Sequence, residues 1–305
     1  MIGFRRSAHH SSGGHRFLAI LCLAACLPGA TAGCATAPYR YGTVREDARP
    51  VALRSESGPQ IVRGKPHAVL DGVGWVFGIP SKITMWNSRM ENHRISPETE
   101  NAVSEYLASN DLDHVKVRLN QYDPCDDWRR LVANKSVGWG WKYSLGTLSW
   151  VGETLLPGRV FGGDHYNPFT ETIHLYSDIP AVAVHEGGHA KDFATRYYKG
   201  TYAAGYLLPI APLYYEAVAT NDAVSYFRAE GRQADELEAY RVLYPAYGTY
   251  VGNAAGNLVA GGGFPIYVAG VIGGHITGRM QARQVEREFA TQPNPETVRG
   301  APATK

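Results

Sequence analysis

Two histidines four residues apart, with a glutamate beside the first, are the strongest chemical signal in this chain. The segment His185-Glu186-Gly187-Gly188-His189 lies in a predicted helix from Ala181 to about Tyr198. Residues i and i+4 of a helix share a face, so His185 and His189 can present two imidazole nitrogens to one cation. Glu186 is rotated from His185 by about 100°, which places it where it can take a proton from water on the metal. Zinc suits this pattern, because imidazole is a good zinc ligand and zinc lowers the pKa of bound water.

A third ligand is needed, because zinc sites that activate water usually have three protein ligands. Pro212 opens a predicted helix over about Leu213 to Ala229, and Glu216 lies in its first turns. Ala219 and Ala223 follow on the same face as Glu216, and small residues there allow another helix to approach closely. The sequence therefore predicts Glu216 as the third metal ligand.

This combination resembles the gluzincin metallopeptidases, in which a glutamate on a second helix completes the zinc site. The resemblance covers about residues 160–230 and is specific at the five-residue motif and at Glu216. It implies a zincin-like catalytic domain in which His185, His189 and Glu216 hold Zn²⁺. Glu186 would deprotonate the water that attacks a peptide carbonyl, and would then pass the proton to the leaving amine.

One position departs from the family pattern. Gluzincins commonly carry Glu-x-x-x-Asp, whose aspartate orients the first histidine. Here Thr220 stands in that place, and the nearest carboxylate is Asp222, two residues further on. Either Asp222 reaches the histidine through a local distortion of the helix, or the histidine is oriented in another way.

The elements around the motif predict an α+β fold that is predominantly helical, with a small sheet edging the HExxH helix. Ser96 and Pro97 have the types expected at a helix start, and residues 114–119 alternate as in a half-buried strand. Ser177 or Asp178 is the predicted cap of the motif helix.

A predicted strand within residues 163–175 precedes the motif helix. The resemblance implies that it is an edge strand that pairs with extended substrate. His165, Tyr166 and His174 lie in this segment and could stabilise an oxyanion, although we expect a structural hydrogen-bonding role for each.

A glycine-rich segment follows the predicted catalytic domain. From Val242 to Gly278 there is no Asp, Glu, Lys or Arg, and glycine recurs every four residues on either side of Gly261-Gly262-Gly263. This pattern predicts two closely packed helices and resembles the glycine-zipper hairpins of envelope lipoproteins. A pair of packed helices in a soluble domain is the alternative, because each half is short for a bilayer, which needs about 20 apolar residues.

The N-terminal segment predicts export. A basic region precedes an apolar run from Phe17 to Ala25, and Thr31-Ala32-Gly33-Cys34 then resembles the lipobox of bacterial lipoproteins, in which the cysteine is lipidated. Cys26 is the alternative lipidation site, and an ordinary secretory signal cut near Ala32 is a further alternative. We therefore expect a lipid-anchored protein of the bacterial envelope that faces the periplasm, at the outer membrane.

These signals divide the chain into five parts. They are a signal peptide with lipobox (1–34), a tether (35–65), a zincin-like catalytic domain (66–240), a glycine-rich apolar helical hairpin (241–280) and a charged, partly disordered tail (281–305). The formal net charge of +2 gives no reason to expect nucleic-acid binding.

The sequence thus predicts zinc-dependent peptide-bond hydrolysis in the envelope, on a peptide or protein substrate. A second hypothesis is a non-enzymatic lipoprotein with a structural or vestigial zinc site, in which the hairpin contacts the membrane. A third is a zinc hydrolase that acts on a non-peptide amide, such as cell-wall material.

Overall fold

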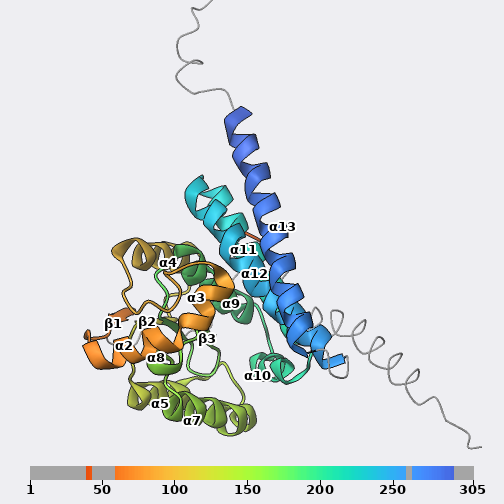
Figure 1. Ribbon diagram of the computed structural model, residues 1–305. Coiled ribbons are helices and arrows are strands. Elements are labelled where there is room, and N and C mark those ends of the chain that lie inside the picture. Colours follow the sequence, from red (N-terminus) through yellow and green to blue (C-terminus); the bar gives the residue numbers. More distant parts are fainter. Residues whose placement is uncertain (1–38, 43–58, 259–262, 292–305) are drawn as a thin grey trace, which may run out of the picture.

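The computed structural model describes residues 39–42, 59–258 and 263–291, which are mostly helical. Figure 1 shows the sheet and the short helices in one half of the molecule and the long helices in the other, with α9 between them. The expected class, α+β and predominantly helical, is confirmed at this level.

The three longest described helices, α11, α12 and α13, all lie beyond α9 in the chain. In chain order the described elements are β1 (Ile61–Arg63), α2 (Ala68–Phe77), α3 (Ile79–Met85), α4 (Pro97–Ser109), β2 (Lys116–Leu119), α5 (Pro124–Ala133), α6 (Trp139–Trp141), η1 (Lys142–Gly146), α7 (Thr147–Leu155), α8 (Gly158–Phe161), β3 (His165–Asn167), β4 (Thr172–Leu175), α9 (Pro180–Ala194), α10 (Lys199–Ala204), η2 (Gly205–Leu207), α11 (Ala211–Ala229), α12 (Gln233–Leu258) and α13 (Gly263–Thr291). The expected helices at Pro97 and Pro212 are α4 and α11, and the strand expected over 114–119 is β2.

The sheet has the order β1-β2-β4-β3, with β3 antiparallel to β4 and the other pairs parallel. The segment 163–175, expected to hold one strand, is a hairpin of β3 and β4. Its turn is held by Asn167, whose side-chain oxygen accepts from the backbone N–H of Phe169 at 2.9 Å. The strand at the edge, β3, contacts α9 as expected.

Two parts of the predicted tether belong to the folded body. Residues 61–63 form β1, which pairs with β2 because backbone pairing satisfies polar groups that the sheet would otherwise leave open. Near the N-terminal end of the described chain, the backbone N–H of Gly42 donates to Asp222 at 2.8 Å. The prediction of a tether over the whole of 35–65 is therefore wrong at these positions.

Helix α9 is the centre of the fold, since every residue from Pro180 to Phe193 is buried. Neither predicted cap is used: Ile179 precedes the helix, and no side-chain cap bond is made there within the described residues. Asp178 instead accepts hydrogen bonds at the start of α4, from Ser96 N at 2.8 Å and from Thr99 Oγ1 at 2.7 Å. The carboxylate thus joins α4 to the start of α9.

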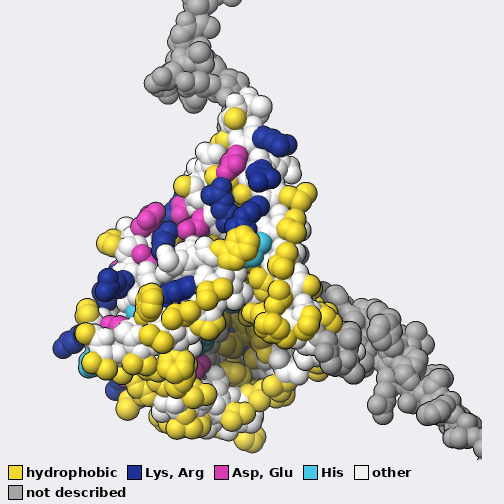
Figure 2. Space-filling view, viewed as in Figure 1, with side chains coloured by type: hydrophobic (Ala, Val, Ile, Leu, Met, Phe, Trp, Pro, Cys, Tyr) yellow, Lys and Arg dark blue, Asp and Glu magenta, His cyan; other side chains and the backbone are white. Residues whose placement is uncertain are grey.

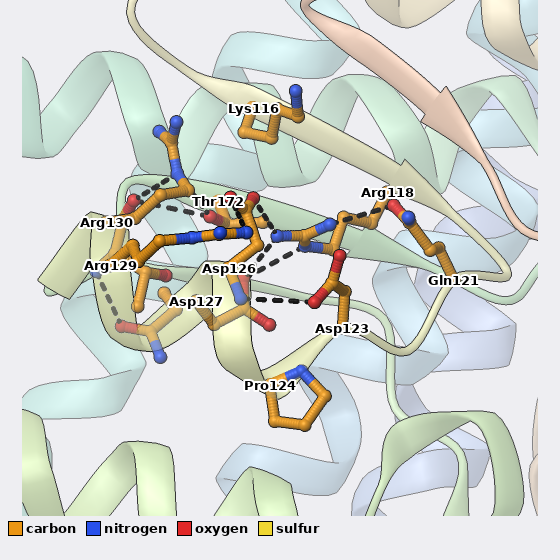
Figure 3. A network of polar contacts seen from close by, with 12 residues as sticks. Lys116, Arg118, Gln121, Asp123, Pro124, Asp126, Asp127, Arg129, Arg130 and Thr172 are labelled. Carbon is orange, nitrogen blue, oxygen red and sulfur yellow. Dashed lines mark hydrogen bonds and ion pairs between the residues drawn. The ribbon is translucent and has the colours of Figure 1, made fainter. Parts of the chain in front are cut away.

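Two arginines fasten α5 to the sheet (Figure 3). Arg118 of β2 is buried, and its guanidinium pairs with Asp126 at 2.6 Å and with Asp127 at 2.8 Å. Arg130 of α5 donates to Thr172 of β4 at 3.1 Å. Both arginines therefore join α5 to the sheet, Arg118 through β2 and Arg130 through β4.

The predicted helical hairpin is present, but its boundaries are different. Helix α12 runs without interruption through residue 240, so the predicted boundary there is wrong. Helix α13 continues to Thr291, through residues assigned to the tail, because Ala282 and Val285 are buried and Arg241 pairs with Glu286 at 2.6 Å.

The glycine stripes allow the backbones of α12 and α13 to touch. A Cβ added at Gly248 would lie 2.3 Å from the carbonyl oxygen of Gly270, and one added at Gly270 would lie 2.4 Å from that of Gly248. Close helix contact through glycine is therefore confirmed. None of the helices among the described residues combines the length and the apolar composition that are needed to span a membrane.

Candidate metal centre

Helices α9 and α11 bring the three predicted ligands together. His185 Nε2 lies 3.1 Å from Glu216 Oε2, His189 Nε2 lies 3.4 Å from Glu216 Oε1, and the two Nε2 atoms are 3.1 Å apart. All three side chains are buried. Two ring nitrogens at this distance can share at most one proton, whereas a cation would bind both and the carboxylate. The residues therefore form a group that could hold a metal ion, and two nitrogens with one oxygen suit zinc.

The Gly-Gly spacer of the motif is explained by helix packing. A Cβ on Gly187 would lie 2.5 Å from the ring of Tyr106 in α4, and one on Gly188 would lie 3.2 Å from Ala219 in α11. The expectation that Ala219 lets α11 approach is confirmed. The space next to the two glycines is filled by side-chain and backbone atoms of α4 and α11.

Burial opposes ionisation of both glutamates, but the resulting pKa shift has opposite directions in the two. Burial raises the pKa of Glu186 to about 7, and the nearby Glu216 and Asp164 carboxylates act in the same direction. Burial also opposes ionisation of Glu216, but His189 and His185 outweigh it and hold the pKa of this carboxyl well below its usual range. Glu216 is therefore an anion, as a metal ligand must be.

The first histidine is oriented by Thr220, and Asp222 is used elsewhere. Thr220 Oγ1 lies 3.4 Å from His185 Nδ1. Asp222 is fully buried and accepts from Lys191 Nζ at 2.8 Å and from the hydroxyl of Tyr106. A local distortion that carries Asp222 to the histidine does not occur, because this carboxylate already neutralises a buried lysine.

The three ligands and Glu186 line a cavity whose other wall comes from α12. Val242, Leu243, Ala246, Thr249 and Tyr250 all face it. Figure 2 shows the molecule hollowed on this face, with hydrophobic side chains around the hollow. The sequence had placed these α12 residues in a separate hairpin, so their part in the site was missed. In a stretch without charges, the wall of a cavity and a helix–helix interface have the same composition.

Two tyrosines of this cavity are further candidates that the sequence did not single out. Tyr206 of η2 and Tyr250 of α12 both line it beside the glutamates. Burial and the Glu216 carboxylate raise the pKa of each hydroxyl well above its usual value. Both hydroxyls therefore keep their protons at neutral pH and can donate hydrogen bonds.

The three oxyanion candidates of the β3–β4 segment lie in different surroundings. His165 and Tyr166 line the cavity, and Tyr166 also packs against Phe193 in the core. His174 is buried and stacks on His165, and it is not among the residues that line the cavity. His165 faces the cavity, and its ring nitrogens contact the carbonyl oxygen of Gly163 at 2.9 Å and the carboxylate of Glu153 at 3.3 Å.

The predicted lipidation site Cys34, and its alternative Cys26, lie outside the described residues. The chain matches no protein-family model, no curated protein and no solved structure.

Proposed function

We propose that this chain is a zinc-dependent hydrolase of peptide bonds. The observation that carries the proposal is the convergence of His185, His189 and Glu216 next to Glu186 on the wall of a cavity. A purely structural site would need no acid or base beside it and no opening to a substrate. The cavity therefore favours an enzyme over a lipoprotein with a structural or vestigial metal site.

The residues of the site have distinct roles in this proposal. Zn²⁺, when bound by the two histidines and Glu216, would polarise a substrate carbonyl and acidify a water molecule. Glu186 accepts the proton of the attacking water and delivers it to the leaving amine. Tyr250 and Tyr206 face the same cavity, and their hydroxyls can donate to the oxygen on which negative charge develops.

The edge strand supports a polypeptide substrate in a zincin-like catalytic domain. In the part of the chain that the structure describes, β3 pairs with β4 on one side only, and it lies against α9. An extended peptide can therefore add to its free edge through backbone hydrogen bonds, and this would bring a scissile bond towards the ligands. The same chemistry acts on other amides, so cell-wall material is an alternative substrate for the same site.

Exposed apolar side chains on the surface support a location of the protein at the membrane. Large apolar side chains are strongly exposed on α6, α7, η2 and α13, among them Trp139, Leu155, Leu207 and Phe264, and Figure 2 shows hydrophobic side chains along the lower part of the molecule. Exposed apolar area of this kind is typical of interaction sites. We propose that a lipid anchor at Cys34 holds the protein in the bacterial envelope, facing the periplasm, and that the apolar surface, including the hairpin region, contacts lipid.

The test compares Glu186→Gln, Glu216→Gln and a control, Glu230→Gln, at the exposed end of α11. Zinc content is measured on each purified protein, and cleavage is followed with a labelled unfolded protein. Glu186→Gln should keep its zinc and lose turnover, Glu216→Gln should lose the zinc ion of this site, and Glu230→Gln should behave as the wild type. Unchanged cleavage by Glu186→Gln contradicts the mechanism, and unchanged zinc in Glu216→Gln removes that ligand. Zinc-dependent cleavage of cell-wall amides without cleavage of protein supports the alternative substrate.

A further inference from the structure

A second group of metal-ligating side chains lies beside the first, on the β3–β4 hairpin and α7. It consists of Glu153, His165 and His174, whose ligand atoms all lie within 4.8 Å of one another. His165 and His174 are direct partners across the two strands, so their rings stand on the same face of the sheet with centroids 4.7 Å apart. Glu153 reaches the pair from α7, and its Oε1 lies 3.3 Å from His165 Nε2.

The imidazole ring of His165 is oriented by a hydrogen bond of the kind that orients metal-bound histidines. Its Nδ1 lies 2.9 Å from the carbonyl oxygen of Gly163, which can only accept, so Nδ1 carries the hydrogen in this bond. Nε2 then directs its lone pair towards the Glu153 carboxylate. Two electron-rich atoms at this distance require a positive charge between them, either a proton or a metal ion. A backbone carbonyl behind the ring is the usual support of a histidine ligand.

Two further atoms decide between the proton and the metal ion. Glu153 Oε2 and His174 Nε2 are buried, and neither has a hydrogen-bond partner within the described residues. A proton shared by His165 and Glu153 Oε1 would leave both atoms unpaired, at a cost in free energy. A cation would take a lone pair from each ligand. Glu153 Oε1 is also held by Asn167 Nδ2 at 2.6 Å, so the carboxylate is already fixed in position.

We infer that Glu153, His165 and His174 form a second metal site, for a divalent cation of the zinc class. Two imidazole nitrogens and one carboxylate oxygen suit zinc and its first-row neighbours better than magnesium or calcium, which prefer oxygen ligands. A small cavity lined by Asp127, Trp150 and Tyr176 opens beside the cluster, and α5 forms part of its wall. His165 also lines the larger cavity that contains Glu186. The two sites therefore share one wall, and the second does not depend on the proposed hydrolysis.

The experiment counts metal ions in the full chain. Wild type, Glu153→Gln, Glu216→Gln and Ser149→Ala are loaded with zinc and dialysed against metal-free buffer, and zinc per chain is measured by mass spectrometry of the elements. Ser149→Ala is the matched control, because Ser149 donates to Glu153 Oε1 at 3.3 Å from one turn earlier on α7 but supplies no ligand. Circular dichroism shows whether each variant is folded. Native mass spectrometry of the wild type gives a count that needs no variant.

We expect two zinc ions in wild type and in Ser149→Ala, and one in each glutamate variant. The affinity of the second site should fall at least about tenfold in Glu153→Gln. The second site is overturned if wild type and Glu153→Gln bind the same number of zinc ions, whether one or two. It is also overturned if wild type binds no zinc. Loss of an ion in Glu153→Gln but not in Glu216→Gln supports the second site and contradicts the first. The two proposals can therefore fail separately.

Discussion

The two glycines of the motif provide a test of how α9 is packed, through the variants Gly187→Ala and Gly188→Ala. Both replacements favour the helix by about 1 kcal/mol, because alanine loses less backbone entropy than glycine. The surroundings differ. The new methyl group at residue 187 would lie 2.5 Å from the ring of Tyr106, and the one at residue 188 would lie 3.2 Å from Ala219.

The ring of Tyr106 has little freedom to move away. It is fully buried, and its hydroxyl donates to Asp222. Overpacking of this kind costs about 1 to 3 kcal/mol, so Gly187→Ala should lower the free energy of unfolding by about 1 kcal/mol after the helix gain is subtracted. At residue 188, a shift of Ala219 by a few tenths of an ångström would make room for the methyl group. Gly188→Ala should therefore leave the free energy of unfolding nearly unchanged.

Urea unfolding followed by circular dichroism, with zinc held constant, measures both variants. Tyr106→Leu adds a double-mutant cycle: Gly187→Ala should cost less in that background, and the coupling should be absent for Gly188→Ala. The reasoning fails if Gly187→Ala is as stable as wild type, or if Gly188→Ala is the more damaging replacement. Either result would mean that α4 does not press on α9 at residue 187.

Three further predictions concern the site and its support. Tyr250→Phe should lower kcat about 100-fold with zinc content unchanged; a normal kcat would remove this hydroxyl from the mechanism. Asp178→Ala should lower the free energy of unfolding by about 1 to 2 kcal/mol at pH 7, because the bonds from Ser96 and Thr99 are lost. Burial opposes ionisation of Asp178, but these bonds lower its pKa below 3.8 overall. The extra stability of wild type over Asp178→Ala should therefore be lost as the pH falls below about 4. If urea unfolding gives the same difference in stability between the two proteins at pH 3 as at pH 7, this explanation is wrong. Zinc at about 1,000 times the Kd of the site formed by His185, His189 and Glu216 should stabilise wild type through that site by about 4 kcal/mol, and thermal melting should show that Glu216→Gln loses this contribution.

Much of the site could be predicted because it depends on neighbours along the chain. The spacing of His185 and His189 places both rings on one face of any helix, whatever surrounds it. Ser96 and Pro97 start α4 through contacts within one turn, and the glycine stripes of α12 and α13 follow from helix geometry. Glu216 could be chosen because its helix has a proline in the first turn and carries small residues on the same face.

The rest required contacts between residues far apart in the sequence. Asp178 looks like a cap for α9 but holds α4, and Asp222 looks like a partner for His185 but neutralises Lys191. Tyr250 reaches the site because α12 folds back over α9, and the His165–Glu153 contact exists because α7 approaches the edge strand. A carboxylate or hydroxyl satisfies whichever donor or charge the packed chain brings within reach. Local sequence therefore determines that the two ligands of α9 share a face, and only tertiary packing decides what surrounds them.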